Sequence, residues 1–334
     1  MMVDKRLNEL RAQANVPGER HDAMFFFCHL IKVVSTSGSV PVLGDSESRV
    51  PVILIHKPAA THSATDNYGS GWDLIVPAGW AMPFHIGMVY RGARVCGLRE
   101  LENSDFEMFQ SNFPLMYPDT AAGKVENENM REELERKHKR KPPAKRVNFE
   151  KLGVLCPHHN PWSRLTCDWS AEADGVSTPV LRDTSKLRDI QQCLDSKRLL
   201  STSATRSNHL IPVRIDTLSR GCCDSLSLIC IPSADDVEQL QRDSEFGGPK
   251  ERVHSKTMAD TQSFRDHCDR TVIGFVSVGK FSFRVGRGVG LGFVVFEALR
   301  RLQRESVWVN NRLLVLVRSQ TSFQYRFVRL SILY

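Results

Sequence analysis

The C-terminal part of the chain, residues 271–334, consists of short apolar runs that follow one another closely. Each run has the length of one strand and is rich in β-branched and aromatic residues, and glycines or polar residues separate the runs. This spacing predicts a small β-barrel or β-sandwich. The runs are TVIGFVSVGKFSF, VGLGFVVF, LLVLV and FQYRFVRLSIL.

The glycine-rich stretch GRGVGLG lies inside this block and invites comparison with phosphate-binding loops. A dinucleotide-binding loop needs a glycine where Leu291 or Phe293 stands, and no Lys-Ser or Lys-Thr pair follows as in a P-loop. The chain also has no G-x-S-x-G or H-E-x-x-H motif, and no acid, base and nucleophile lie near one another in the sequence. We interpret the glycines as strand and turn positions at a bend of the barrel. They are Gly286, Gly288, Gly290 and Gly292.

The whole chain is predicted to be an α+β protein of two domains joined by a connector. Its 334 residues, 41% hydrophobic and 25% charged, are enough for a sizeable core. We predict an α+β region over residues 1–170, a variable connector over 171–221 and a β-rich domain over 222–334. The expected elements are helices over 7–14, 83–90, 126–141 and 186–200, strands over 25–34, 50–55, 72–76 and 226–231, and a helix with a Ser233–Asp236 capping box.

Residues 136–151 form a strongly basic arm. They contain eight lysines and arginines against one acid, Glu150, a net charge of +7 that equals the formal charge of the whole chain. The arm begins on the predicted helix 126–141, whose acids precede its bases as the helix dipole favours, and Pro142-Pro143 then ends that helix. Such density favours contact with a polyanion, and nucleic acid is the first choice. The residues expected on phosphates are Lys137, Lys139, Arg140, Lys141, Lys145 and Arg146.

Three other interpretations of the arm stay open: a solvated helix face, a nuclear-import signal, or a surface for acidic proteins. A second basic group, Arg91, Arg94 and Arg99, lies at or beyond the end of the predicted helix 83–90 and is expected to support the arm in binding RNA. Nearby aromatic residues could stack on bases, but core packing is the preferred interpretation for most of them. They are Trp72, Trp80, Phe84 and Tyr90.

The cysteines and histidines do not predict a metal site. Cys156, His158, His159 and Cys167 have suitable side chains, but their spacing fits no standard zinc pattern. Nine scattered cysteines without a C-x-x-C pair favour reduced thiols and an intracellular protein. The longest apolar run, 23–34, is too short for a membrane span, and no secretory signal is visible. We therefore expect neither metal, cofactor nor membrane.

Four stretches closely resemble the POPLD region of the largest protein subunit of eukaryotic ribonuclease P and ribonuclease MRP. The ending, DRTVIGFVSVGKFSFRVGRGVGLGFVVFEAL with SFQYRFVRLSIL, is similar to the C-terminal domain of that family. The four stretches are GSGWDLIVPAGWAMPFHIGMVYRGARVCGLRE (69–100), YPDTAAG (117–123), ERKHKRKPPAKRVNFEKLG (135–153) and PWSRLTCDW (161–169).

The resemblance implies a non-catalytic, RNA-binding scaffold in the nucleus and nucleolus. In this family the RNA subunit removes the 5′ leaders of precursor tRNA, or cleaves precursor rRNA in the MRP form. The implied partners are that catalytic RNA and the smaller protein subunits, with precursor tRNA met indirectly. The amino-terminal half of the family is missing from this sequence, so we expect a carboxy-terminal portion, a short isoform or an incomplete gene model.

Two alternative functions remain. The ending also resembles the barrel of the folate-dependent aminomethyltransferases, which implies a one-carbon enzyme with a folate pocket and an acidic anchor, and no such anchor can be placed on the sequence. A protein-only nuclear adaptor that binds acidic partners is the other alternative.

Overall fold

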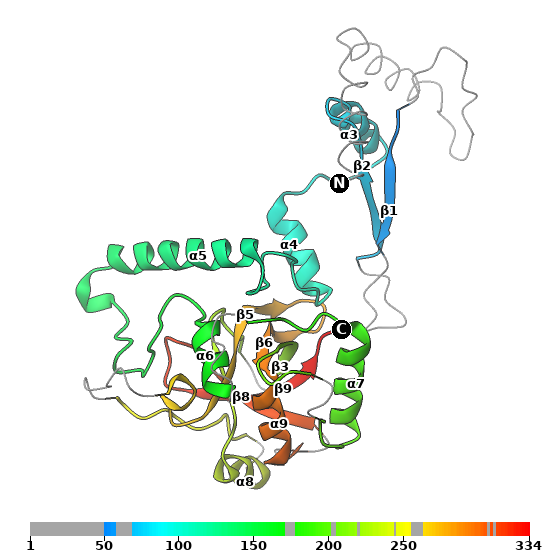
Figure 1. The fold of residues 1–334 in the computed structure, drawn as a ribbon. Helices are drawn as coiled ribbons and strands as arrows, with labels where there is room; N and C mark the ends of the chain where they lie inside the picture. The colour runs from blue at the N-terminus through cyan, green and yellow to red at the C-terminus, as the bar shows by residue number, and fades with distance from the viewer. Residues whose placement is uncertain are drawn as a thin grey trace, which may run out of the picture. The chain divides into compact units, whose positions relative to one another are not determined.

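The computed structural model describes residues 50–57, 69–170, 178–201, 205–218, 221–243, 245–254, 263–305, 308–309 and 312–334. The predicted helix 7–14 and strand 25–34 lie outside these residues. The chain divides into two compact units, residues 1–104 and 105–334, which are described separately (Figure 1).

The first unit contains a β-hairpin and helices. β1 (Ile53–Lys57) pairs antiparallel with β2 (Gly71–Ile75), and α3 (Ala81–Tyr90) and the start of α4 (Leu98–Glu107) follow. The predicted strands and the predicted helix over 83–90 are therefore present, while α4 was not predicted. Gly92 ends α3 at a φ of +89°, a backbone conformation that glycine adopts without steric cost.

The second unit is built around a closed, six-stranded antiparallel barrel. The strands follow the order β4-β5-β6-β3-β9-β8, and β4 also pairs with β8, which closes the ring. A short strand, β7 (Trp308–Val309), extends β8. The structure thus confirms the barrel rather than the sandwich. The six strands are β3 (Leu210–Thr217), β4 (Leu228–Cys230), β5 (Val272–Ser282), β6 (Arg287–Val295), β8 (Arg312–Arg318) and β9 (Tyr325–Ile332).

Helices α6 (Trp162–Trp169), α7 (Thr184–Asp195) and α9 (Phe296–Arg304) contact strands of this barrel, as Figure 1 shows. The Trp162 ring meets Phe275 edge-to-face at 5.1 Å between centroids. The α6 helix therefore belongs to the barrel core, and the boundary predicted at residue 170 falls inside the second unit. Helix α8 (Ala234–Arg242) begins with the predicted Ser233–Asp236 capping box.

The segment 171–221, predicted as a variable connector, contains two elements of the same core. Helix α7 corresponds to the helix predicted over 186–200. Strand β3 was not predicted, although it pairs with β6 on one side and β9 on the other and is almost entirely buried. Its Pro212 and its alternating Arg214 and Asp216 hide the apolar pattern, because proline is rare in central strands.

The glycines of GRGVGLG have the structural role that was predicted for them. Gly286 lies in the turn before β6 at a φ of +71°. Within β6, a Cβ atom on Gly292 would lie 2.2 Å from the carbonyl oxygen of Phe275, so only glycine allows the two strands to approach so closely.

Candidate nucleic-acid interface

The basic arm begins on a long helix, α5 (Ala121–Arg140), that starts at a well-defined cap. The Thr120 hydroxyl accepts a hydrogen bond from the Gly123 amide at 2.9 Å and donates toward the carbonyls of Pro114 and Tyr117. Pro142 follows the C-cap residue Lys141, and the short 3₁₀ helix η1 (Pro143–Lys145) turns the chain. The arm is therefore folded structure rather than a free tail.

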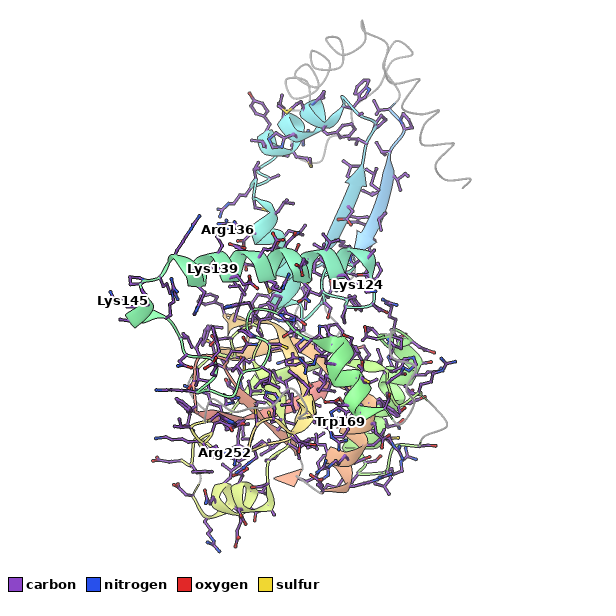
Figure 2. All side chains as sticks on the ribbon, turned by 60° about the vertical axis from the view of Figure 1, so that its left-hand side comes forward. Lys124, Arg136, Lys139, Lys145, Trp169 and Arg252 are labelled. Carbon is purple, nitrogen blue, oxygen red and sulfur yellow. The ribbon has the colours of Figure 1, made fainter. Side chains whose placement is uncertain are left out.

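All six arm residues predicted to bind phosphate are exposed. Figure 2 shows Arg136, Lys139 and Lys145 at one end of α5, with Lys124 near the other end. Cations at the C-terminal end of a helix also offset its negative pole. The structure thus places the predicted cations together around one helix end.

Ion pairs within α5 divide these cations into two groups. Lys137 pairs with Glu133 at 2.6 Å, and Lys139 pairs with Glu135 at 3.7 Å, each one helical turn back. Across the described residues, no carboxylate pairs with the second group, which is therefore the better placed to meet phosphate. This group is Arg136, Arg140, Lys141 and Lys145, and sequence reasoning left Arg136 out of the site.

Arg146 has a structural role that the sequence did not reveal. Its guanidinium folds back onto the end of α5, where Nε donates to the carbonyl of Lys141 at 2.8 Å and Nη2 donates to that of Lys139 at 2.7 Å. Carbonyls at a helix end have no partner within the helix, so these bonds fix the turn after α5. Its contact with phosphate stays a prediction.

Three aromatic rings pack together between the end of α5 and the segment that follows the arm. His138 of α5, Phe149 and His158 lie with ring centroids 5.0 to 5.4 Å apart. Burial, with the neighbouring His138 as a smaller cause, lowers the pKa of His158, so its ring stays neutral at physiological pH. Sequence reasoning weighed His158 as a metal ligand, and the structure instead uses it in packing.

Two backbone contacts then fix the end of the arm to the barrel unit. The Lys151 carbonyl accepts a hydrogen bond from the His254 amide at 3.0 Å, and the Leu152 carbonyl accepts one from Nη1 of Arg318 at 2.8 Å. Gly153 follows at a φ of +64°, and a Cβ atom there would lie 2.5 Å from Nε2 of His254. Both ends of the arm are therefore attached to folded elements.

Arg318 lies at the centre of a buried polar cluster in the barrel unit. Its Nη2 contacts the Cys268 sulfur at 3.0 Å, and its Nε lies 3.8 Å from the Glu251 carboxylate. Glu251 also accepts hydrogen bonds from the Tyr325 hydroxyl and contacts Nε2 of His254 at 2.7 Å. Arg318 and Glu251 are both buried, and their proximity offsets part of the loss of water around the two charges.

The nearby His267 gives this cluster a pH dependence. Its Nδ1 contacts the Phe264 carbonyl, while its Nε2 is buried without a hydrogen bond from any residue that the structure describes. Burial, the largest cause, lowers the pKa of His267 to about 4. The folded protein therefore keeps the ring neutral, whereas the unfolded chain takes up a proton near the usual pKa of about 6.5.

We expect the stability that this ring contributes to be complete above pH 6.5 and to fall as the pH drops toward 4. The free energy of unfolding should decrease by about 2 kcal/mol between pH 7 and pH 5 through His267 alone. Urea unfolding at both pH values measures this loss, and His267→Asn should remove most of it. An equal pH dependence in the variant would assign the effect to other groups.

The structure does not gather Cys156, His158, His159 and Cys167 into one group, and both cysteines are free thiols. Among the described residues, no group of three or more His, Cys, Asp or Glu side chains could hold a metal ion. The Cys156 sulfur lies 3.7 Å from Nη1 of Arg164, and Cys167 is exposed. In the same part of the chain, no helix has both the length and the apolar character that a membrane crossing requires.

Arg91, Arg94 and Arg99 belong to the first unit, and all three are exposed. Arg91 is the C-cap residue of α3. Arg99 instead lies in the first turn of the next helix, α4, and not at the C-terminal end of α3. The prediction that most of the nearby aromatic rings pack in the core is wrong for Trp72 and Tyr90, whose side chains are 61% and 69% exposed. The Trp72 ring lies against that of His56, at 4.7 Å between centroids.

The fold and the arm together define an α+β protein that fixes a group of cations beside a closed barrel. Two family models match this chain. The POPLD (NUC188) domain matches residues 71–169, and the POP1 C-terminal domain matches residues 209–263 and 255–334. Together the two models cover most of residues 71–334, and the chain belongs to the family that they describe, with a POPLD (NUC188) domain followed by a POP1 C-terminal domain.

Curated relatives agree with this assignment. The ribonucleases P/MRP protein subunit POP1 of Homo sapiens is 26% identical, over 98% of this chain and 44% of the relative. The subunit popl-1 of Caenorhabditis elegans is 27% identical over 59% of this chain and 26% of its own length, and pop1 of Schizosaccharomyces pombe is 26% identical over 69% and 29%. The chain thus spans less than half the length of each of these relatives.

Proposed function

We propose that this chain is a non-catalytic, RNA-binding scaffold subunit of ribonuclease P and ribonuclease MRP ribonucleoproteins. The observation that carries the proposal is the folded arm: six exposed basic residues around the end of α5, held at both ends by the second unit. A fixed cluster of cations binds the phosphate backbone without the entropic cost of ordering a flexible tail. The names of the relatives supply the type of complex.

In this proposal the phosphates of RNA contact Lys137, Lys139, Arg140, Lys141, Lys145 and Arg146. Arg91, Arg94 and Arg99 form a second contact on the first unit. Arginine suits such contacts because its planar fork can hold two phosphate oxygens at once. The six arm residues and the three arginines lie in different units, so they are proposed as two independent contacts.

The proposed partners are the catalytic RNA and the smaller protein subunits of the same complexes, with precursor tRNA met through them. In this proposal the RNA performs the cleavage that removes precursor-tRNA leaders or processes precursor rRNA, and the chain braces it. The nucleus and nucleolus are the proposed location. The arm would also serve as the signal for import into the nucleus.

A folate-dependent one-carbon enzyme is less well supported. The barrel resembles that family only in the sequence pattern of its strands, and fold does not fix function. A cavity of about 540 Å³ at one end of the barrel is lined by Thr217, Leu218, Gly221, Phe281, Gly286, Arg287 and Gly288, a set without an acidic anchor. Saturable binding of a reduced folate to the purified chain would support the enzyme.

Crosslinking in cells tests the proposed function. The tagged chain is crosslinked, recovered under denaturing conditions, and the attached RNA is sequenced. We expect enrichment of ribonuclease P or MRP RNA, with crosslinks at residues 137–146. Recovery of no RNA above background would contradict the proposal, and partners that survive nuclease treatment would favour a protein-only adaptor.

A further inference from the structure

The hairpin between β5 and β6 presents two phenylalanines to solvent. Phe281 is 45% exposed and Phe283 is 87% exposed, and their rings meet edge-to-face at 5.5 Å between centroids. Neither residue belongs to the buried core clusters of the unit. Because a large exposed aromatic ring is unfavourable in water, this pair points to a ligand.

A single carboxylate holds the tip of this hairpin in place. Glu107 accepts hydrogen bonds from the Ser282 hydroxyl at 2.6 Å, from the Phe283 amide at 3.0 Å and from the Arg284 amide at 3.3 Å. The Glu107 carbonyl also accepts one from the Arg284 guanidinium at 3.0 Å. The backbone that carries the Phe283 ring is therefore fixed before any ligand arrives, which lowers the entropic cost of binding.

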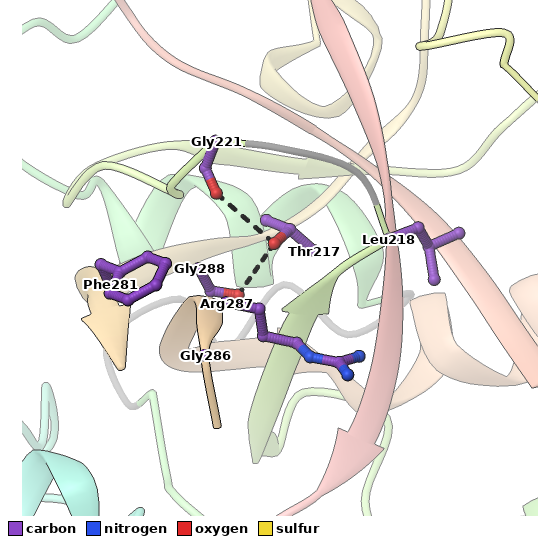
Figure 3. Close-up of a pocket in the computed structure, with 7 residues that line it drawn as sticks. All are labelled: Thr217, Leu218, Gly221, Phe281, Gly286, Arg287 and Gly288. Carbon is purple, nitrogen blue, oxygen red and sulfur yellow. Dashed lines mark hydrogen bonds between the residues drawn. The ribbon is translucent and has the colours of Figure 1, made fainter. Parts of the chain in front are cut away.

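Phe281 also lines a cavity, whose lining residues Figure 3 shows. Phe281 stands opposite Gly288 in the strand pairing, so no side chain crosses to cover its ring. Within the lining, the Thr217 hydroxyl lies at hydrogen-bond distance from the carbonyls of Gly288, at 3.1 Å, and Gly221, at 3.4 Å. The cavity volume of about 540 Å³ is within the range of small-ligand sites.

The charges around the tip favour an anion. Lys280, Arg284 and Arg287 lie within eight positions of one another in the hairpin. Arg287 lines the cavity, and its side chain makes no hydrogen bond or ion pair with any described residue. At the tip, both carboxylate oxygens of Glu107 accept the hydrogen bonds described above. Phe281 and Arg287 line the same cavity, so it offers both an aromatic ring and a guanidinium, the two groups that a base and its phosphate require.

We propose that the β5–β6 tip binds an unpaired nucleotide of RNA, with the base stacked on Phe283 and the adjoining phosphate on Arg287. The proposal rests on the proposed function, because it assumes that this chain binds RNA. It adds a second mode of recognition. The arm contacts the phosphates of RNA of any sequence, whereas the tip requires an unpaired base that is not stacked in a helix.

Binding of the full chain to two fluorescent RNAs tests the proposal, one a single-stranded uridine oligomer and the other a blunt duplex. Phe283→Leu keeps an apolar side chain but removes the ring face, and Phe283→Trp keeps a ring face. We expect Phe283→Leu to weaken binding of the single strand about 5- to 150-fold and to leave duplex binding unchanged. Phe283→Trp should bind the single strand as the unchanged chain does.

Equal single-strand affinity of the unchanged chain and Phe283→Leu would overturn the proposal, even if binding remained sensitive to salt, and the proposed function would then stand. No binding of either RNA by the unchanged chain would overturn both. If Phe283→Leu instead removed a protein partner from nuclease-treated complexes while RNA affinity stayed equal, the tip would be a protein-docking surface and the proposal wrong.

Discussion

Replacement of Arg318 by methionine is expected to destabilise the second unit by about 3–5 kcal/mol, the range for removal of one partner from a buried charge pair. The substitution leaves the Glu251 carboxylate buried without its cationic partner. It also removes the hydrogen bond to the Leu152 carbonyl and the contact with Cys268. Urea unfolding followed by far-UV circular dichroism measures the change in the free energy of unfolding.

Arg242→Met provides the matched control. Arg242 pairs with Glu238 one turn away on α8, and both side chains are largely exposed. Exposed pairs of this kind contribute about 0–1 kcal/mol, so the control should unfold almost as the unchanged chain does. If Arg318→Met were as stable as Arg242→Met, the buried cluster would not hold the barrel unit together.

Alanine substitution of all six arm residues is expected to weaken binding to RNA of every sequence and to flatten its salt dependence. Each lost phosphate contact lowers the slope of log affinity against log salt by about 0.7 for single strands, so six contacts account for about 4. Between 50 and 200 mM salt the unchanged chain should therefore lose about two orders of magnitude more affinity than the variant. Titration of labelled RNA at four or five salt concentrations gives both slopes.

A charge-conserving variant separates charge from packing in this measurement. Lys137, Lys139, Lys141 and Lys145 become arginine, and Arg140 and Arg146 become lysine, so that the guanidinium cap of α5 is lost while every charge is kept. The slope should stay that of the unchanged chain. An equal slope in the alanine variant would place the phosphate contacts elsewhere and leave the arm as an import signal.

Local patterns predicted the elements whose signals are local. The charge order of 126–141 and the following prolines predicted α5, and the Ser233–Asp236 spacing predicted the start of α8. The alternating runs after residue 271 predicted the barrel. Each of these signals lies within about one element, where helix caps and side-chain periodicity act.

Contacts between distant residues could not be predicted in this way. Arg318 and Glu251 are separated by 67 positions, and Glu251 lies in a stretch whose polar composition gives no sign of burial. Glu107 and Ser282 are 175 positions apart. The role of Arg146 as a helix cap was also hidden, because an exposed arginine in a basic run looks like every other member of the run.

The closure of the barrel by the β4–β8 pairing determines how partners can attach to each unit. The six strands of the ring have both edges paired, and among the described strands of this unit only the two-residue β7 lies at the end of the sheet, so partners bind the unit mainly through side chains and loops. Among the described residues, no other strand pairs with the outer edges of the two-stranded sheet of the first unit, and its β1 residues Ile53, Leu54 and Ile55 are exposed. Addition of a strand from another chain, which binds mainly through the backbone, is therefore available to the hairpin, whereas the six strands of the closed ring exclude it.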